Sequence, residues 1–582
     1  MRGRIFVQYT LSVFLLACLA LFLILPVWLT IRGGFIDRDA DQWTIQHILL
    51  IFSDPTLRSG LLNATLIACA TTCCCLVISL PLALLNVKCN YPGKALWSAV
   101  ILVPLILPPF VGAIGMRQLL GRYGALNSLL GDAGIDWLGT AKFWGVVIVE
   151  ALHLYPIVYL NATAALANLD PTLEEAARNI GVSPLRRFWS IILPLIRPGL
   201  FAGCTIVFIW SFTELGTPLM FDYYEVTPVQ IFSRIKEMEN SAQPYALTAV
   251  MLFCAIMFYV LGKMVFGGRA YAMYSKASIA SQTKRLSTLA GFGASGLFLV
   301  VTGLAVLPHI GVILTSFSEN GQWYHSVLPS GWTTQHYEDA LTHKLAMGSI
   351  TNSLKYAVIA MLITLLAGVT IGYIVVRTRV IFRGLLDALS ILPLAVPGLV
   401  MAFGYVALTL EPPFNWTAET APDWGRWFLP IAGWFDVLGP TANPLVLLVV
   451  AYSVRRLPYM VRSTVAGLEQ TSQELEEASR NLGAGPATTI RRVTLPLIMA
   501  NLIAGGLLVF AFSMLEVSDS LILAQREIHF PFTKAIYTFF ERLGDGQYIA
   551  SAMGVWGMAL LTVTLVGASL LLGKKMGAIF RV

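Results

Sequence analysis

Residues 174–196 read EEAARNIGVSPLRRFWSIILPLI, and residues 476–498 read EEASRNLGAGPATTIRRVTLPLI. The two stretches match at a constant offset of 302 residues, which pairs Gly181 with Gly483. A polar segment that recurs in register within one chain indicates an internal repeat. The repeat decides the fold, because it divides the chain into two copies of one unit.

The chain around these segments is strongly apolar. Of its 582 residues, 57% are hydrophobic and 12% are charged, whereas soluble domains are about a quarter charged. Apolar runs long enough to cross a bilayer recur along the sequence, and such long runs favour helices over barrel strands. We therefore expect an all-α polytopic membrane protein with about 12 transmembrane helices, each of roughly 20 residues. The expected spans are 8–32, 60–87, 97–116, 143–167, 199–221, 245–266, 290–316, 352–376, 386–410, 442–461, 500–524 and 549–573.

The first apolar run, from Ile5 to Leu29, follows two arginines and could be taken for a signal peptide. It is longer than the usual apolar region of such peptides, and no clean small-residue cleavage site follows it, so we interpret it as a retained anchor. Lys and Arg are in excess in the loops on the N-terminal side of the membrane. This bias predicts that both termini are cytoplasmic.

The repeat extends beyond the polar segments. Asn63 matches Asn352, and Pro108 matches Pro397, at an offset of 289. The offset grows to 302 beyond this region, so the second copy contains an insertion, which we place in a predicted outward loop, 411–441. This loop either lies at the membrane interface or docks a partner. Its tryptophans are Trp416, Trp424, Trp427 and Trp434.

We divide the chain into a first repeat, 1–266, a cytoplasmic linker, 267–289, and a second repeat, 290–582. Each repeat has six expected spans, with a polar island between the fourth and the fifth. The first island is 170–198 and the second is 471–500. Because six is even, both repeats enter the membrane in the same direction, and an axis along the membrane normal can relate them.

Each island contains signals for a short helix that ends at a glycine. Asp170, followed by proline, is a good helix start, and Thr471 with Glu474 has capping-box spacing. Gly181 and Gly483 can end these helices in a left-handed conformation. Two short helices joined by a glycine and held between membrane spans can transmit a movement. The alternative is a basic cytoplasmic loop without a further role.

The motif Glu-Ala-Ala, followed by glycine and later by Leu-Pro, resembles the EAA loop of permease subunits of binding-protein-dependent ABC importers. The resemblance covers nearly the whole chain, as two fused permease units, and implies the type I importer permease fold. In that family the loop is a coupling helix seated in a cleft of an ATPase subunit. The residues that match the motif, and would carry this contact, are Glu175, Ala176, Ala177, Gly181, Glu477, Ala478, Ser479 and Gly483. Ser479 replaces an alanine, so the two docking sites are unequal.

The chain has no phosphate-binding loop of the type G-x-x-x-x-G-K-[ST], and its seven histidines have no H-E-x-x-H spacing. We therefore expect no catalytic residues, no metal site and no cofactor on this chain. Its eight cysteines fall mostly in the expected spans and fit helix packing. The resemblance implies two ABC ATPase subunits, which bind ATP and Mg, and an extracytoplasmic substrate-binding protein. The net charge of +7 is explained by membrane lipid, without nucleic acid.

Glu214 and Glu516 occupy matching positions in the fifth expected span of each repeat. A charge inside a span costs about 2.5–3.5 kcal/mol on insertion scales, so it indicates a function by default. Both carboxylates are candidates for the translocation pathway, where they would attract a cation. The alternative is that each bonds to a neighbouring helix. Prolines inside the third span of each repeat suggest broken helices that could form a gate.

Fused double permeases of this length and layout resemble the iron(III) type of importer, in the bacterial inner membrane. Related fused permeases carry thiamine, 2-aminoethylphosphonate or hexose phosphates, and these cargoes stay open. A different class also stays open, namely a secondary transporter or channel driven by an ion gradient. That class fits parallel repeats but gives no use for duplicated coupling loops.

Overall fold

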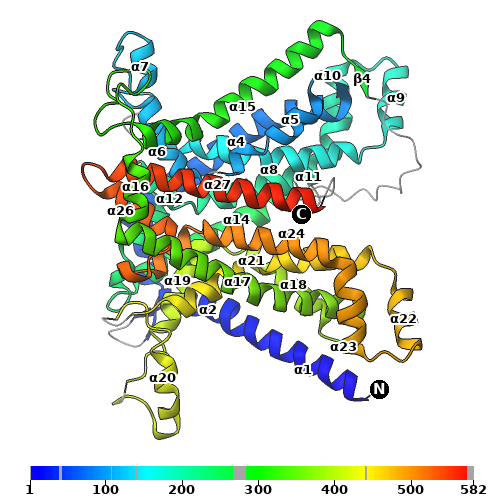
Figure 1. Cartoon of the computed structure of the whole chain (residues 1–582), viewed down its shortest axis with the longest axis vertical. Helices are drawn as coiled ribbons and strands as arrows, with labels where there is room; N and C mark the ends of the chain where they lie inside the picture. Colours follow the sequence, from blue (N-terminus) through cyan, green and yellow to red (C-terminus); the bar gives the residue numbers. More distant parts are fainter. Residues whose placement is uncertain are drawn as a thin grey trace. The chain divides into compact units, whose positions relative to one another are not determined.

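A computed structural model describes residues 2–37, 42–106, 108–138, 142–266, 283–417, 419–439 and 442–572 (Figure 1). Helices dominate these residues, which confirms the all-α prediction. The strands of the described part are two short pairs: β1 Ile36–Asp37 with β2 Gln42–Trp43, antiparallel, and β3 Cys89–Asn90 with β4 Lys284–Arg285, parallel. Residues 267–282 of the expected linker lie outside the described residues.

The chain forms two compact units that are discontinuous in sequence. Unit 1 comprises Met1–Pro55, Gln230–Leu252 and Gln335–Ile579, and unit 2 comprises Thr56–Val229, Phe253–Thr334 and Phe580–Val582. Two helices, α13 (Thr227–Ser233) and α14 (Gln243–Phe266), begin in one unit and end in the other. The two compact units therefore do not coincide with the two sequence repeats. The repeat boundaries 1–266 and 290–582 stay a prediction.

The α-helices of unit 1 are α1 Arg2–Leu19, α2 Leu25–Gly34, α3 Gln46–Ser53, α16 Gln335–Thr342, α17 Lys344–Arg377, α18 Arg383–Ile391, α19 Gly398–Thr409, α20 Leu429–Ala432, α21 Leu445–Glu469, α22 Gln473–Asn481, α23 Pro486–Thr489, α24 Leu495–Met514, α25 Ser518–Leu523, α26 Phe532–Glu541 and α27 Gly546–Leu572. Those of unit 2 are α4 Pro55–Lys88, α5 Lys94–Val100, α6 Pro109–Leu120, α7 Ala125–Leu129, α8 Phe143–Ala167, α9 Pro171–Asn179, α10 Pro184–Arg187, α11 Leu193–Phe212, α12 Gly216–Met220 and α15 Thr288–Phe317.

Eight helical segments in the described ranges are long and apolar enough to cross a membrane, and two bent pairs raise this to ten. The bent pairs replace the third span of each repeat, and the second pair turns by 105° at Pro397. Proline lacks a backbone N–H and so breaks a helix at this point, as the sequence suggested. The two other expected spans, 442–461 and 549–573, fall on α21 and α27, and α21 carries Arg455 and Arg456.

Each unit joins the first span of one repeat to the third span of the other. In unit 1, α2 packs on α19, and a Cβ atom on Gly404 would lie 2.7 Å from the carbonyl oxygen of Pro26. In unit 2, α15 packs on α6, and a Cβ on Gly115 would lie 2.4 Å from the carbonyl oxygen of Pro308. Gly115 and Gly404 occupy equivalent positions in the two repeats, at the offset of 289. Both close contacts therefore require a residue without a side chain at this position.

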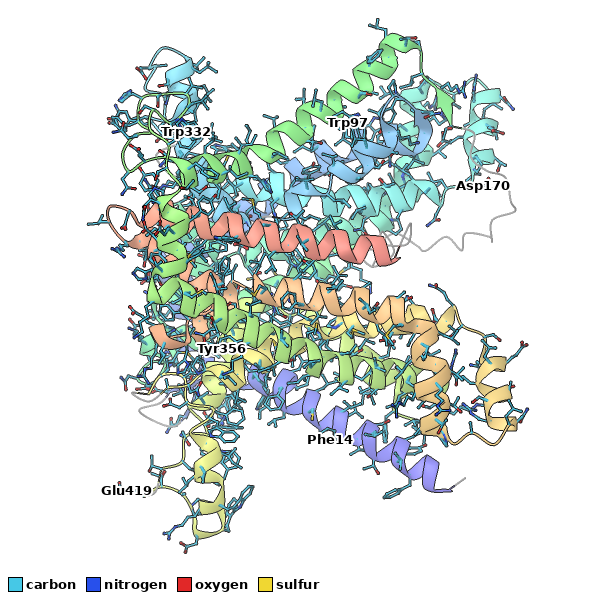
Figure 2. All side chains as sticks on the ribbon, in the orientation of Figure 1. Phe14, Trp97, Asp170, Trp332, Tyr356 and Glu419 are labelled. Carbon is cyan, nitrogen blue, oxygen red and sulfur yellow. The ribbon has the colours of Figure 1, made fainter. Side chains whose placement is uncertain are left out.

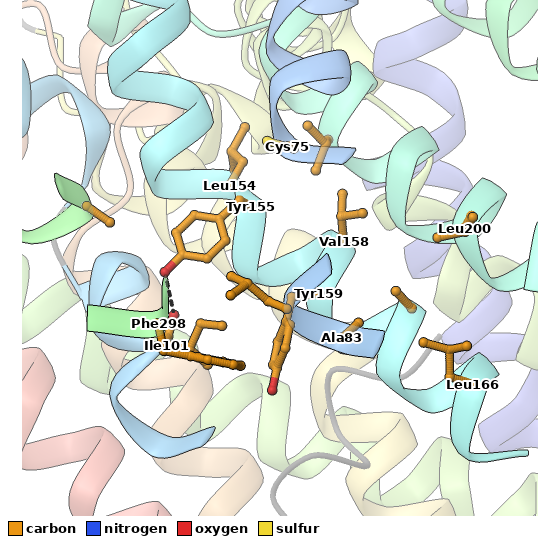
Figure 3. Packing of buried hydrophobic residues seen from close by; sticks show 14 of the residues in the cluster. Cys75, Ala83, Ile101, Leu154, Tyr155, Val158, Tyr159, Leu166, Leu200 and Phe298 are labelled. Carbon is orange, nitrogen blue, oxygen red and sulfur yellow. Dashed lines mark hydrogen bonds between the residues drawn. The ribbon is translucent and has the colours of Figure 1, made fainter. Parts of the chain in front are cut away.

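The core of unit 2 lies between α4, α8, α11 and α15 (Figure 3). Tyr155 is fully buried there, and its hydroxyl donates a hydrogen bond to the carbonyl oxygen of Ile101 at 3.4 Å. The hydroxyl of Ser79 donates to the carbonyl oxygen of Tyr155 at 2.7 Å. These bonds satisfy polar groups inside an apolar bundle, where an unpaired group is costly.

The tryptophan-rich loop contains α20 and a 3₁₀ turn, Asp423–Phe428. Three of its rings are strongly exposed, namely Trp424, Trp427 and Trp434. Trp416 instead packs edge-on against Trp424, with ring centroids 5.4 Å apart. The exposed rings fit both readings of this loop, an interfacial belt and a partner surface.

Candidate functional site

The first island forms the helix and the glycine end expected from its sequence, and Figure 2 labels Asp170 at the start of this helix. Asp170 caps α9 by accepting a hydrogen bond from the backbone N–H of Thr172 at 2.9 Å. It also accepts one from the Thr172 hydroxyl at 2.7 Å, and these bonds, the hydroxyl bond most, lower the pKa of Asp170. Gly181 follows α9 with a φ of +81°. Val182 N–H donates to the carbonyl oxygen of Ala177 at 3.0 Å, which completes a Schellman motif. The glycine therefore ends the helix because a left-handed residue is needed there.

The second island has the same design. Gly483 follows α22 with a φ of +85°, and Ala484 N–H donates to the carbonyl oxygen of Ser479 at 3.1 Å. The expected cap, Thr471, is wrong by one residue. Ser472 has the extended backbone of a cap, and its hydroxyl accepts from the N–H of Glu474 at 3.2 Å.

Beyond the glycine, each island continues into the fifth span without a break. In unit 2, α10 is joined to α11 by a π-helical turn, Phe188–Ile192, and in unit 1 α23 is joined to α24 by a π-helical turn, Ile490–Thr494. The two π turns occupy equivalent positions at the offset of 302. Each island is therefore joined to the fifth span of its repeat by continuous helix, and single π turns often occur at functional positions.

The other end of each island is held by an ion pair to the second span. Lys88, the last residue of α4, pairs with Glu174, and both side chains are about a quarter exposed. Arg377, the last residue of α17, pairs with Glu476 at 3.1 Å, and these side chains are 6% and 5% exposed. The pairs are equivalent across the repeats, since Lys88 matches Arg377 and Glu174 matches Glu476. Each island is thus fixed to its own unit by charge.

Each island exposes an apolar stripe of two side chains, one in the first turn of the short helix and one at the residue that caps its C-terminal end. Leu173 is 47% exposed and Ile180 is 80% exposed, and the equivalent Leu475 and Leu482 are 49% and 89% exposed. Positions seven residues apart lie on one helix face. Large apolar side chains that are exposed at matching places in both repeats indicate a contact surface for another protein.

The residues of the EAA motif divide between this surface and the interior. Those that are exposed are Glu175, Ala176, Gly181, Glu477, Ala478 and Gly483. Ala177 is buried, and Ser479 is half-buried with its hydroxyl 3.1 Å from that of Thr489. The leucines and the isoleucine of the stripe are not part of the EAA motif, although the constant offset of 302 and the helical spacing both mark them.

Glu516 lies in a break between α24 and α25, not inside a span. It is 5% exposed and pairs with Arg455 and Arg456. Arg455 also lies 3.2 Å from the carboxylate of Asp519, which is fully buried. The carboxylate of Glu516 is therefore part of an internal charge network of unit 1.

Glu214 lies in the equivalent break of unit 2, between α11 and α12, and is half-buried. It accepts hydrogen bonds from the N–H of Thr217 at 3.2 Å and from its hydroxyl at 3.3 Å. The position that matches Arg455 is occupied by His153. The two carboxylates thus share a position in the repeat but differ in their surroundings, and their place on a translocation pathway stays a prediction.

The island geometry is the same in both repeats and fits a duplicated coupling element, and comparison with known proteins identifies the family of the chain. Residues 4–272 and 364–576 match the model of the binding-protein-dependent transport system inner membrane component. The chain belongs to this family. It is therefore the membrane-embedded permease component of an ABC importer, and the fused arrangement of two permease units is confirmed.

Members of the family that resemble the chain include ferric transport permeases. The ferric transport system permease protein FbpB of Actinobacillus pleuropneumoniae is 26% identical over 494 residues, which are 82% of this chain and 66% of that protein. The Fe(3+)-transport system permease protein FbpB 2 of Haemophilus influenzae is 24% identical over 550 residues, 92% of this chain and 94% of its own length. The molybdenum transport system permease protein ModB of Escherichia coli K12 is 34% identical over 179 residues, 30% of this chain and 74% of that protein.

Proposed function

We propose that this permease imports iron(III), powered by ATP hydrolysis on separate subunits. The cargo is supported by the ferric transport permeases, which match most of the chain, including one relative over 94% of its own length. The match to the molybdenum permease covers only 30% of the chain, so it supports the shared permease unit and not the cargo. Thiamine, 2-aminoethylphosphonate and hexose phosphates remain alternative cargoes.

The observation that carries the coupling role is the pair of equivalent islands. Each presents an exposed apolar stripe, ends at a left-handed glycine and continues into a membrane span. We expect each stripe to bind in a cleft of one ABC ATPase subunit, so that two ATPase subunits bind one chain. ATP and Mg would then be bound by those subunits and not by this chain.

The orientation of the chain in the membrane follows from this coupling role. If the islands contact ATPase subunits, they face the cytoplasm, and both termini lie on that side, as the distribution of Lys and Arg predicts. A substrate-binding protein would deliver the cargo at the opposite surface. The inner membrane of a bacterium is the expected location, since both ferric relatives come from bacteria.

Reconstitution in vesicles tests this function. The purified chain, its ATPase subunit and its binding protein are placed in proteoliposomes, and uptake of radioactive iron(III) is measured with and without the ATPase. We expect uphill uptake only with ATPase and ATP. Uphill uptake that persists without the ATPase, and follows an imposed ion gradient, would instead favour the secondary transporter. ATP-driven uptake of molybdate, but not of iron(III), would contradict the cargo.

A further inference from the structure

A lysine lies buried in unit 1 at the end away from the second island. Lys534 belongs to α26 and is 9% exposed. The chain enters α24 from α23 and leaves it towards α25 and α26, so α22 and α26 lie at opposite ends of a 20-residue helix (Figure 1). Such a helix is about 30 Å long. Lys534 is therefore remote from the coupling surface.

Aromatic rings surround the ammonium group of this lysine. Its Nζ lies 5.2 Å from the ring centroid of Phe232, 5.6 Å from that of Phe530 and 5.9 Å from that of Tyr537. Nζ also donates a hydrogen bond to the carbonyl oxygen of Leu521 at 3.1 Å. The rings attract the cation through their faces, but they do not replace a carboxylate.

Lys534 forms no ion pair within the part of the chain that the structure describes. The carboxylate of Glu541 on the same helix accepts a hydrogen bond from the hydroxyl of Tyr537. Burial lowers the pKa of Lys534 to about 8, an effect that Lys236 reinforces and Glu541 opposes. The lysine is thus protonated at neutral pH, and an ammonium has three donors, of which the carbonyl of Leu521 takes one.

The position of Lys534 along unit 1 connects it to the cargo. Lys534 and α22 lie beyond opposite ends of α24. If the islands face the cytoplasm, as proposed, Lys534 lies towards the opposite surface, where a substrate-binding protein would deliver the cargo.

We propose that Lys534 is an anion-recognition group for the cargo, which binds a carboxylate or phosphate group carried by the cargo when Phe232 and Tyr537 move aside. This inference rests on the proposed function in requiring a permease whose islands face the cytoplasm, and it implies that a metal cargo travels with an anionic ligand. A buried ammonium without a carboxylate is unfavourable unless another group compensates it. The anionic group of the cargo supplies that compensation.

Anion binding by the purified chain tests the proposal without ATPase or binding protein. The thermal stability of the detergent-solubilised chain is measured against citrate and inorganic phosphate, with chloride at equal ionic strength as the reference. We expect citrate or phosphate to stabilise the wild type. Lys534→Met should weaken the apparent affinity about tenfold or more, which corresponds to the loss of one charge-assisted hydrogen bond. Lys534→Arg should retain the effect.

Two further variants separate recognition from a merely structural role. Phe232→Ala uncovers the ammonium and should strengthen anion binding, whereas a structural role predicts no gain. Lys344→Met removes an exposed lysine at the first residue of α17 and should leave anion binding unchanged. A wild type that neither citrate nor phosphate stabilises, or a Lys534→Met variant that keeps the effect, would overturn the proposal. So would stabilisation by phosphatidylglycerol alone, because it assigns the site to lipid.

Uptake in proteoliposomes then connects the site to transport. Lys534→Met should reduce ATP-driven uptake of ferric citrate about tenfold, and Lys534→Arg should stay close to the wild type. If the wild type imports no iron, the iron assignment fails, while the binding result still decides the role of Lys534. If the wild type imports iron and Lys534→Met does so equally well, the inference fails and the proposed function stands.

Discussion

Replacing the two island glycines by alanine isolates the backbone conformation on which the coupling surface depends. Gly181 and Gly483 have φ values of +81° and +85°, and a Cβ built on either would have no atom within 4 Å. The substitution therefore introduces no clash, and its cost is the left-handed conformation itself, roughly 1–2 kcal/mol for a residue with a side chain. Each substitution should lower the equilibrium constant for the correctly ended helix about 5- to 30-fold.

The matched control is Gly485, two residues beyond Gly483. Its φ is −67°, which any residue adopts, and a Cβ there also has no atom within 4 Å. We expect Gly181→Ala and Gly483→Ala each to weaken binding of the ATPase subunit about 5- to 30-fold, with uptake per ATP reduced, and Gly485→Ala to behave as wild type. Binding is measured on the permease in nanodiscs, and insertion by membrane fractionation. Wild-type affinity and uptake in both alanine variants would refute the reasoning.

Three further predictions concern charged residues of the described structure. Arg377→Met removes one of the two ion-pair partners of the buried Glu476, which keeps Arg480 at 3.2 Å, and should lower the free energy of unfolding by about 1.5–3 kcal/mol. Lys88→Met, at a more exposed pair, should cost about 1 kcal/mol or less. Denaturation of the purified variants compares them, and equal losses would contradict the burial argument. Glu516→Gln should reduce the stability and the yield of the chain, because Arg455 and Arg456 each lose a partner. The relative uptake of different cargoes should stay constant. A changed cargo preference in a stable Glu516→Gln variant would instead place this residue on the pathway. The pKa of Lys534 is lowered to about 8 in the folded chain, so between about pH 8 and 10.5 the unfolded chain binds more protons than the folded chain. The free energy of unfolding should therefore rise with pH over this range, by about 3 kcal/mol in total relative to Lys534→Met. Parallel curves of stability against pH for the two proteins would contradict this.

Much of the fold was predictable because the repeat fixes register independently of propensity. The helix ends at Gly181 and Gly483 followed from the glycine rule, and the broken third spans followed from their prolines. The cap of α22 was misplaced because Thr471 and Ser472 are adjacent hydroxyl residues. Only the backbone conformation decides which of them caps, and Ser472 has the extended one.

The placement of Glu214 and Glu516 shows where apolar patterning stops being informative. Hydrophobic residues continue beyond Phe212 and Met514, so the expected fifth spans extended to 221 and 524. The helices α11 and α24 end at Phe212 and Met514, and both carboxylates fall in the breaks that follow. The partners Arg455 and Arg456 come from a different span, and the sequence carries no signal that brings them to Glu516.

Nor does the sequence identify which helices touch. The contact of α2 with α19, and of α15 with α6, depends on close approach at Gly404 and Gly115, and apolar helices carry no visible mark of their partner. The exposed stripe of each island is predictable from the sequence. Leu173 and Ile180 lie on one helix face, and apolar residues recur at the equivalent positions of the second repeat, outside the EAA motif.

The central claim, that the two islands receive the force of separate ATPase subunits, is tested most directly by placing a charge on both stripes. Ile180→Asp with Leu482→Asp changes two side chains that are 80% and 89% exposed, so the fold of the chain should not depend on them. The measurement is ATP-driven uptake of iron(III) by proteoliposomes that contain the ATPase and the binding protein. The account predicts that the doubly substituted chain inserts normally but neither retains the ATPase nor supports uptake. Wild-type uptake by this variant would contradict it.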